Sequence, residues 1–390
     1  MTGNQTILII GGSFGGIKTA WDLRNKLPRK HNIILMSDKP KTTFRASFPR
    51  VVFEDLPLEE LVLDLKSNFN DSGIEFKTDR LVSIDQPNDE VVGSTGRYQF
   101  DYLVLATGAR HAYELIPGSY EHAHSICDPS RIMETKAAVQ EFRKGDVYAG
   151  VTAGYTPCDG PPLEMILSMD HRLRKLNHRS KTNLNFITDK ANLMPPGGPK
   201  TWAYLKELFK KRQITAHLDV SLERLDGKYL YFEEGSRKHY DLCLLVPPYR
   251  GIKELEKSGL TDEKGFIPVL QTTMRSQKCE NDNIYAVGDA AALPGPKQGH
   301  ITLMQAGVAA AHIAWRINGK GDVPSYLPEF KCVAYSGGKN GIYMYADWLS
   351  DGDTVEIKSG TKPYLSKIEF EQLFFSKKGN IGELHRKMMK

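Results

Sequence analysis

The chain has 390 residues, 40% of them hydrophobic and 25% charged, which is the balance of a globular protein rather than of a disordered or membrane-spanning one. This length exceeds what one hydrophobic core organises, so we expect two domains and a smaller appendage. The net charge of +5 and the absence of a long Lys/Arg run exclude a dedicated nucleic-acid-binding protein. No apolar stretch reaches the length of a spanning helix, so we expect any membrane contact to be peripheral.

The N-terminal segment predicts a strand, a glycine-rich turn and a helix. Residues 7–10 are apolar and too short for a signal peptide, which favours a cytoplasmic protein. Gly11 and Gly16 hold the outer positions of a G-x-G-x-x-G pattern, and Ser13 replaces the middle glycine. Such glycines allow the backbone to approach a pyrophosphate, which also binds the free N–H groups of the helix N-terminus. For the pattern on its own, a simple turn is the alternative.

Three later segments give this loop a context. Residues 32–37 predict a second strand, which ends at Asp38. An acid at this place accepts a hydrogen bond from a ribose hydroxyl, although a solvated Asp at a strand end is the alternative. Residues 98–105 predict a buried strand that closes on Ala-Thr-Gly, and residues 283–287 predict another that closes on Gly288-Asp289. Together these signals predict a dinucleotide-binding fold that holds FAD.

The glycine-rich segment 7–23 and the segments 98–110 and 283–291 resemble the motifs of the flavin disulfide reductase superfamily. In that superfamily the Asp of the late Gly-Asp pair holds the ribityl and pyrophosphate part of FAD, which implies this role for Asp289. The resemblance implies an α/β protein with two tandem Rossmann-like domains. We predict a discontinuous FAD domain at 1–110 and 270–318, a second Rossmann-like domain at 111–269, and a C-terminal membrane-surface region at 319–390.

The inserted domain departs from relatives that use a nicotinamide cofactor. Gly150 and Gly154 are not followed by a third glycine at helix spacing, and Tyr155, Pro157 and Cys158 fill the turn instead. A pyrophosphate would meet bulky side chains there rather than bare backbone. We therefore expect this domain to lack a nicotinamide site, and the electron donor to be another compound.

The resemblance narrows to the sulfide:quinone oxidoreductases, particularly the archaeal ones. It implies three functional cysteines at Cys127, Cys158 and Cys332. The matching segments, which follow one another along nearly the whole chain, are Phe44-Arg45 with Pro49, residues 125–129, 158–165, 244–249 and 288–289, 296–299, and 331–334.

The five cysteines differ in what their surroundings predict. They contain no C-x-x-C pair, which excludes a zinc finger or a thioredoxin-type motif, and we predict no metal site. Cys243 lies in an apolar run and is predicted to be a core residue, whereas Cys279 lies in a polar loop and is predicted to face solvent. Cys158 lies in the turn that opens a helix, where N–H dipoles lower the pKa of a thiol. Cys127 and Cys332 are assigned only through the resemblance, because a lone cysteine is otherwise a small buried hydrophobe.

The sulfur chemistry that the resemblance implies is thiol exchange. The ion HS⁻ attacks a disulfide or polysulfide bridge. Cys158 then carries the persulfide, and Cys332 is the thiolate that faces the flavin. Cys127 lies near the flavin edge, and its covalent attachment to FAD is left open.

Two charged residues near these motifs are further candidates. Lys297 precedes a predicted helix and would place positive charge near the pyrimidine end of the flavin, although a surface lysine is the alternative. Glu164 would shuttle a proton or, equally well, interact with the helix dipole. The complete predicted FAD site is Gly11, Gly12, Ser13, Phe14, Gly15, Gly16, Ser37, Asp38, Arg45, Ala106, Thr107, Gly108, Cys127, Gly288, Asp289 and Lys297.

The tail, residues 363–390, combines apolar stripes with basic residues. This composition suits a helix that lies in a lipid interface, and an ordinary core-covering helix is the alternative. The pair Phe374-Phe375, followed by two lysines, favours membrane contact. Upstream, the aromatic side chains of residues 342–348 would either flank a quinone ring or simply pack against other parts of the protein. We thus expect a peripheral protein at the cytoplasmic face of the cell membrane, with sulfide, a membrane quinone and the bilayer surface as partners. A homo-oligomer is left open.

Two other functions compete with sulfide oxidation. A type II NADH:quinone dehydrogenase shares the fold, FAD and the membrane tail, but it predicts an intact second glycine loop. A non-catalytic flavoprotein with a binding or signalling role, in the manner of apoptosis-inducing factor, leaves the placing of Cys127, Cys158 and Cys332 unexplained.

Overall fold

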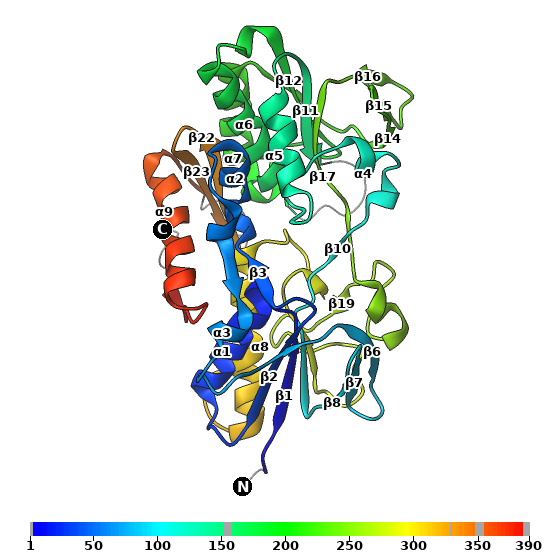
Figure 1. Ribbon diagram of the computed structural model, residues 1–390, viewed down its shortest axis with the longest axis vertical. Coiled ribbons are helices and arrows are strands. Elements are labelled where there is room, and N and C mark those ends of the chain that lie inside the picture. Colours follow the sequence, from blue (N-terminus) through cyan, green and yellow to red (C-terminus); the bar gives the residue numbers. More distant parts are fainter. Residues whose placement is uncertain (1–2, 152–157, 328, 348–354, 385–390) are drawn as a thin grey trace.

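The computed structural model describes residues 3–151, 158–327, 329–347 and 355–384. Two lobes follow one another along the longest axis of the molecule, each built on a parallel sheet (Figure 1). This is the α/β architecture with two Rossmann-like units that the sequence predicts.

The lower lobe contains a five-stranded parallel sheet in the order β20-β9-β1-β2-β5. The strand β20 comes from late in the chain and pairs with β9, so distant segments share one sheet. The helices α1 (Phe14–Lys26) and α8 (Gly299–Asn318) pack against each other in this lobe. The strands are β1 (Thr6–Ile10), β2 (Asn32–Ser37), β5 (Glu75–Thr78), β9 (Tyr102–Leu105) and β20 (Ile284–Ala286).

The prediction of one strand over residues 98–105 is wrong. The chain leaves β8 (Arg97–Gln99) before it enters β9, and Asp101 at the break accepts a hydrogen bond from the Thr6 N–H at 2.7 Å. The two strands serve different sheets, because β8 pairs with β7 (Glu90–Gly93) in an antiparallel meander that begins at β6 (Leu81–Asp85).

The upper lobe contains a four-stranded parallel sheet in the order β13-β12-β11-β17. Cys243 lies in β17 and is 1% exposed, which confirms its prediction as a core residue. The strands are β11 (Gly145–Val151), β12 (Thr182–Thr188), β13 (Ile214–His217) and β17 (Leu242–Val246), and the helices of this lobe are α5 (Ile132–Glu141), α6 (Gly160–Lys175) and α7 (Gly198–Arg212).

Shorter elements join and flank the lobes. The pair β10–β18 lies between the two lobes in Figure 1. The remaining short elements are β3 (Lys41–Thr43), α2 (Phe48–Phe53), β4 (Val62–Asp64), α3 (Leu65–Asn68), β10 (Arg110–His111), α4 (Ser119–His122), β14 (Leu222–Leu225), β15 (Tyr229–Phe232), β16 (Arg237–His239), β18 (Tyr249–Arg250), β19 (Ile267–Pro268) and β21 (Ala291–Ala292).

The C-terminal region is a three-stranded antiparallel sheet followed by helix α9 (Thr361–Ser376). Its strands are β22 (Glu329–Gly337), β23 (Asn340–Asp347) and β24 (Val355–Gly360). The helix lies along the side of the molecule against this sheet (Figure 1).

The predicted lipid-facing role of Phe374 and Ile381 is wrong. Phe374 is 3% exposed, and its ring lies 5.1 Å from Phe14 and 5.4 Å from Phe44. Ile381 is also buried, because the chain after α9 returns to α1, where Trp21 Nε1 donates to the Lys378 carbonyl at 2.8 Å. These positions favour the core-covering alternative for the buried face of the tail. Trp348, Arg386, Lys387, Met388 and Lys390 lie outside the described residues.

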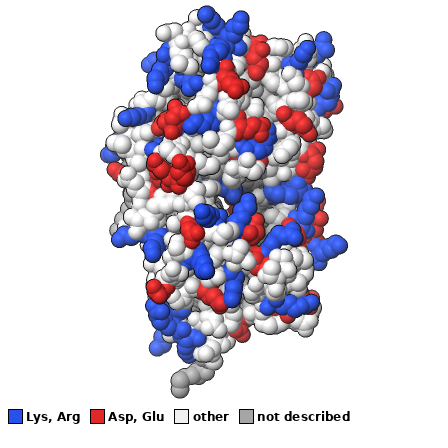
Figure 2. All heavy atoms as spheres, viewed as in Figure 1, with Lys and Arg blue, Asp and Glu red and all other residues white. Residues whose placement is uncertain are grey.

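Apolar side chains of the C-terminal region also face outward. Leu365 and Leu384 are 47% and 42% exposed. Among the described residues, no helix has both the length and the hydropathy to cross a membrane. On the face seen in Figure 2, basic and acidic side chains are interspersed.

Candidate active site

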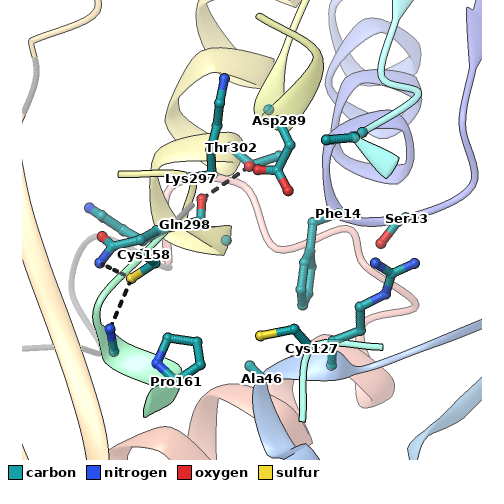
Figure 3. A pocket seen from close by; sticks show the side chains of 18 of the residues that line it. Ser13, Phe14, Ala46, Cys127, Cys158, Pro161, Asp289, Lys297, Gln298 and Thr302 are labelled. Atoms are coloured by element: carbon teal, nitrogen blue, oxygen red, sulfur yellow. Dashed lines mark hydrogen bonds between the residues drawn. The ribbon is translucent and has the colours of Figure 1, made fainter. Parts of the chain in front are cut away.

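A cavity of about 350 Å³ lies where the two lobes and the C-terminal sheet meet. The lower lobe contributes the N-terminus of α1 and the carboxyl ends of β9 and β20, which meet because parallel strands end at the same sheet edge. The upper lobe contributes the N-terminus of α6, and β22 contributes Lys331, Cys332 and Val333. Figure 3 shows residues of the α1, α6 and α8 walls, among them Phe14, Pro161 and Thr302, around an open centre.

Most of the predicted FAD residues line this cavity. They are Ser13, Phe14, Gly15, Arg45, Ala106, Thr107, Gly108, Cys127, Gly288, Asp289 and Lys297.

Five predicted residues lie outside the cavity wall: Gly11, Gly12, Gly16, Ser37 and Asp38. Gly11 has a φ of +121°, and a Cβ on Gly16 would lie 1.8 Å from the Gly11 carbonyl oxygen. These two glycines therefore permit the tight turn itself. Asp38 is exposed after β2.

The polar groups of the cavity fit a flavin dinucleotide. Thr107 Oγ1 and Gln298 Oε1 are buried without a hydrogen bond to a described residue, and such atoms normally have a partner. Asp289 is half-buried and lines the cavity, where its carboxylate would accept from the ribityl hydroxyls of a bound FAD, and a Cβ at Gly108 would meet open space. The N-terminus of α1 offers free N–H groups to phosphate.

Lys297 and Asp289 are two of the charged residues that line the cavity. Burial lowers the pKa of Lys297 to about 8, against the opposing effects of Asp289 and Asp262. Burial likewise raises the pKa of Asp289, against the opposing effects of Lys297, Arg45 and His111. The predicted surface alternative for Lys297 is disfavoured, because its half-buried side chain lines the cavity and its Nζ donates to the Ala291 carbonyl.

The two cysteines of the predicted redox pair meet at the N-terminus of α6. A Cβ built on Gly160 would lie 3.2 Å from Cys332 Sγ and 3.4 Å from Cys158 Sγ. Cys158 Sγ accepts hydrogen bonds from the Gly160 N–H and from Gln298 Nε2, both at 3.3 Å. Figure 3 shows Cys158 with Gln298 on one side of the cavity and Cys127 beside Phe14 on the other. All five cysteines of the chain are unbridged.

The prediction that the helix N-terminus lowers the pKa of Cys158 is wrong. Burial raises that pKa to about 11, and the bonds from Gln298 and Gly160 oppose the rise without reversing it. Burial raises the pKa of Cys127 to about 12. The pKa of Cys332 rises well above its ordinary value through burial, then through Cys158 and Glu164. Desolvation therefore favours uncharged sulfur throughout the cavity.

A buried ion pair lies beside the cysteines. Glu164 Oε1 accepts from the Tyr335 N–H at 2.8 Å and from Lys367 Nζ at 2.5 Å. Burial raises the pKa of Glu164, against the opposing effect of Lys367. From the sequence, a proton shuttle and a partner of the helix dipole are equal alternatives for Glu164; in the structure its carboxylate is bonded to Lys367 on α9.

Gln298, Lys367 and Phe370 also line the cavity and are not among the site residues predicted from the sequence. A signal for Lys367 was present, because it stands at helical spacing between Tyr364 and Phe370 in the buried stripe of α9. Gln298 lies in the matching segment 296–299, but its contact with Cys158 joins residues from different lobes and could not be predicted from the sequence.

Two further predictions from the sequence concern the second glycine loop and Cys279. A Cβ on Gly150 would lie 2.0 Å from the Ile187 carbonyl oxygen, so this glycine permits close strand packing. Gly154, Tyr155 and Pro157 lie outside the described residues. Cys279 is partly buried against the main core, and its Sγ lies 3.3 Å from Asn283 Oδ1, so its prediction as a solvent-facing residue is wrong.

Two parallel sheets around a cavity with a glycine-rich helix N-terminus and paired cysteines define a flavin-dependent oxidoreductase with two dinucleotide-type folds. Residues 5–312 match the family described as pyridine nucleotide-disulphide oxidoreductase, and the chain belongs to this family. FAD is its cofactor, as the sequence predicts.

Individual members of the family are similar to this chain over most of its length. The chain is 27% identical to the sulfide-quinone reductase of Aquifex aeolicus, over 96% of this chain and 92% of the relative. It is 25% identical to the mitochondrial sulfide:quinone oxidoreductase of Dictyostelium discoideum, over 79% of this chain and 70% of the relative. The crystal structure of the Aquifex aeolicus sulfide:quinone oxidoreductase superposes with a TM-score of 0.90 at 25% identity, covering 96% of this chain and 92% of that chain.

Proposed function

We propose that this protein oxidises sulfide at Cys158 and Cys332 and passes the electrons by way of FAD to a membrane quinone. The observation that carries the proposal is the meeting of these two sulfurs around Gly160, at the wall of the predicted flavin cavity. The names of the relatives from Aquifex aeolicus and Dictyostelium discoideum support it. Bound FAD would accept two electrons from the sulfur chemistry and release them to the quinone.

The cysteines work as an exchange pair. In the oxidised protein a disulfide or sulfur bridge joins Cys158 and Cys332. An entering HS⁻ attacks the Cys158 sulfur, the bridge bond breaks, Cys158 becomes a persulfide, and Cys332 leaves as a thiolate. Gln298 and the Gly160 N–H hold the Cys158 sulfur in place. Cys127 lines the flavin side of the same cavity, and its covalent attachment to FAD is an open part of the proposal.

Burial of the cysteines suits this order of events. Since the pKa values of both thiols are raised, neither cysteine is an ionised nucleophile at neutral pH. The attacking anion is therefore the substrate, and the uncharged bridge is the form that the dry cavity favours. Lys367, beside Cys332, opposes the rise in the pKa of that thiol and so stabilises the thiolate when it leaves.

The position of the cysteines also bears on whether NADH is the electron donor. In a nicotinamide-binding unit, the helix N-terminus after the first strand holds a pyrophosphate. Here the corresponding terminus, that of α6, faces the sulfurs of Cys158 and Cys332. This observation favours sulfide over NADH as the electron donor.

The wall of the cavity toward α9 suits the quinone. Ala46, Pro49 and Phe370 make it apolar, and Lys367 supplies a cation for a quinone oxygen. The exposed Leu365 lies on the outer side of the same helix and is our proposed contact with the bilayer surface. We propose the cytoplasmic face of the membrane as the location of the protein, as we expect from the sequence.

Anaerobic mixing of the purified yellow protein with sulfide or with NADH tests the proposal. We expect sulfide, and not NADH, to bleach the flavin absorbance, and a short-chain quinone to restore it. Bleaching by NADH alone would identify an NADH dehydrogenase. Bleaching by neither reductant would favour a non-catalytic role.

A further inference from the structure

The proposed reaction requires one proton more than its reductant supplies. Oxidation of HS⁻ to zero-valent sulfur releases two electrons and one proton, whereas reduction of a quinone to a quinol takes up two of each. The quinone also has two oxygens to protonate, and Lys367 accounts for the recognition of only one of them. A second group on the cavity wall must therefore serve the other oxygen.

The imidazole of His300 is in the right place for this task. His300 lies in the first turn of α8 and lines the cavity, and its side chain is 2% exposed. Its Nε2 lies 2.6 Å from Oε1 of Glu329, the first residue of β22. Glu329 is not part of the cavity wall and its side chain is 23% exposed, so the imidazole ring lies between this carboxylate and the cavity.

The contact between His300 and Glu329 determines which partner carries the proton. The hydrogen bond with His300 lowers the pKa of Glu329 to about 2, against the effect of burial and with a further contribution from Lys331. Glu329 is therefore ionised at neutral pH. Since an ionised carboxylate has no proton to donate, Nε2 of His300 is the donor in this bond. The anion beside the ring also favours a proton on the second ring nitrogen, Nδ1, because it stabilises the charged imidazolium.

Lys331 brings a second cation to the same carboxylate. Its Nζ lies 3.4 Å from Glu329 Oε1, its side chain is 3% exposed, and it lines the cavity. One carboxylate neutralises only one of two cations, so this part of the wall has a net positive charge when His300 is protonated. In a cavity that excludes water, such a charge stabilises the negative charge that develops on a quinone oxygen as electrons arrive.

We propose that His300 is the proton donor to one oxygen of the quinone, and that Glu329 holds the imidazole ring in place and in its charged form. This inference rests on the quinone half of the proposed function. As two electrons reach the quinone from the reduced flavin, the Nδ1–H bond of His300 breaks and an O–H bond of the quinol forms. The other quinol proton is the one that sulfide oxidation releases, and His300 takes up a proton from solvent once the quinol has left. His300 is thus a catalytic residue, whereas Glu329 acts through it and is a positioning residue.

Reduction with stoichiometric dithionite isolates this step, because it reduces the flavin without sulfide. When the reduced protein is mixed with decylubiquinone in a stopped-flow instrument, we expect His300→Gln to recover its flavin absorbance about 100-fold more slowly than wild-type protein, as for the loss of a general acid. The wild-type rate should fall as the pH rises, because only the protonated ring donates, and His300→Gln should lack this fall. Sulfide should bleach the oxidised variant at the wild-type rate.

Other titratable groups near the pair do not produce this difference between the two proteins. They are Tyr326, Lys331, Tyr343, Tyr345 and Asp347. Burial raises the pKa of each of the three tyrosines, so their phenols stay protonated at neutral pH. The lysine and the aspartate, like the charged residues elsewhere in the cavity wall, are present in wild-type protein and in His300→Gln alike. A pH dependence that only wild-type protein shows therefore belongs to His300.

Two more variants distinguish proton donation from a structural role. Glu329→Gln keeps the shape of the partner and removes its charge, so the fall in the rate should begin at a lower pH than in wild-type protein. His312→Gln is the matched control. His312 lies on the same helix outside the cavity wall, and its Nδ1 lies 2.9 Å from Tyr285 Oη. This variant should keep both the wild-type rate and the wild-type pH dependence.

Failure of the proposed function and failure of the His300 assignment give different results. If decylubiquinone reoxidises the dithionite-reduced wild-type protein but sulfide does not bleach the oxidised protein, sulfide oxidation is wrong and the comparison with His300→Gln still stands. If decylubiquinone does not reoxidise wild-type protein, both proposals fail. The assignment of His300 alone is overturned by a wild-type rate and pH dependence in His300→Gln, by equal slowing of bleaching and reoxidation in that variant, or by an unchanged pH dependence in Glu329→Gln.

Discussion

Burial, more than helix position, sets the chemistry of the individual cysteines. Cys158 accepts hydrogen bonds from the Gly160 N–H at the start of α6 and from Gln298 Nε2, and the pKa of its thiol is nevertheless raised to about 11. The sequence identified the helix start correctly. It gave no measure of how completely Gln298 and Cys332, from other parts of the chain, close the site around the sulfur.

Serine substitution tests the exchange pair. We expect Cys158→Ser and Cys332→Ser to retain flavin and to lose bleaching by sulfide by at least about 100-fold, as happens when a nucleophilic residue is removed. Absorbance after anaerobic mixing with sulfide is the measurement. Cys279→Ser, at a partly buried site away from the cavity, is the control and should bleach normally. Normal bleaching of either pair variant would exclude the bridge mechanism.

The buried thiol of Cys243 gives a pH dependence with a definite sign. Burial raises its pKa above the ordinary value of 9.0, so the folded state binds a proton that the unfolded state releases. The stability from this group is complete below pH 9 and declines as the pH rises further. Cys243→Ala should flatten the fall in the free energy of unfolding between pH 9 and 11 by up to about 1.4 kcal/mol per pH unit.

Denaturant unfolding at several pH values measures this difference. Val246→Ala is the control, because it removes buried volume from the same strand without removing a thiol. It should lower stability at every pH and leave the slope unchanged. Equal slopes for wild-type protein and Cys243→Ala would contradict the prediction.

At the scale of elements, helix α9 has one face that packs against the protein and one face that is exposed. Phe374 packs on Phe14 and Phe44 and so fastens the helix to the lower lobe, whereas Leu365 faces outward. We expect Phe374→Ala to lower the free energy of unfolding by about 3–5 kcal/mol, as for other buried phenylalanines. Leu365→Ala should change it by no more than about 0.5 kcal/mol. Urea unfolding of both variants checks this, and similar losses would show that the two faces are not distinct.

Elements formed by local patterns were predictable, and contacts between distant elements were not. The apolar runs at 7–10 and 32–37 and the glycine-rich turn gave β1, β2 and the start of α1, because hydrophobic period and backbone freedom are local properties. The break between β8 and β9 was missed, since it depends on the pairing of β8 with β7 in another sheet. The pairs Glu164–Lys367 and Cys158–Gln298 join separate elements, and only the complete fold brings them together.

At the scale of the whole molecule, the outward apolar residues of the C-terminal region lead to a test of membrane contact. We expect wild-type protein to float with vesicles of mixed neutral and anionic phospholipid, and Leu365→Glu to reduce the bound fraction, because a charge in the lipid interface is unfavourable. Leu218→Glu is the control, since Leu218 is also exposed, at 36%, but lies in the upper lobe. Equal flotation of both variants would place the contact elsewhere.

The pairing of β20 with β9 also sets an order of folding during synthesis. The four strands of the upper sheet have all been made once the ribosome has passed Val246, whereas the lower sheet is incomplete until Ala286 has emerged. The nascent chain must therefore keep β1, β2, β5 and β9 without their last neighbour while the upper lobe folds between them. Chains released early by premature termination would contain a finished upper sheet and a lower sheet with the open edge of β9 exposed, a surface that invites aggregation.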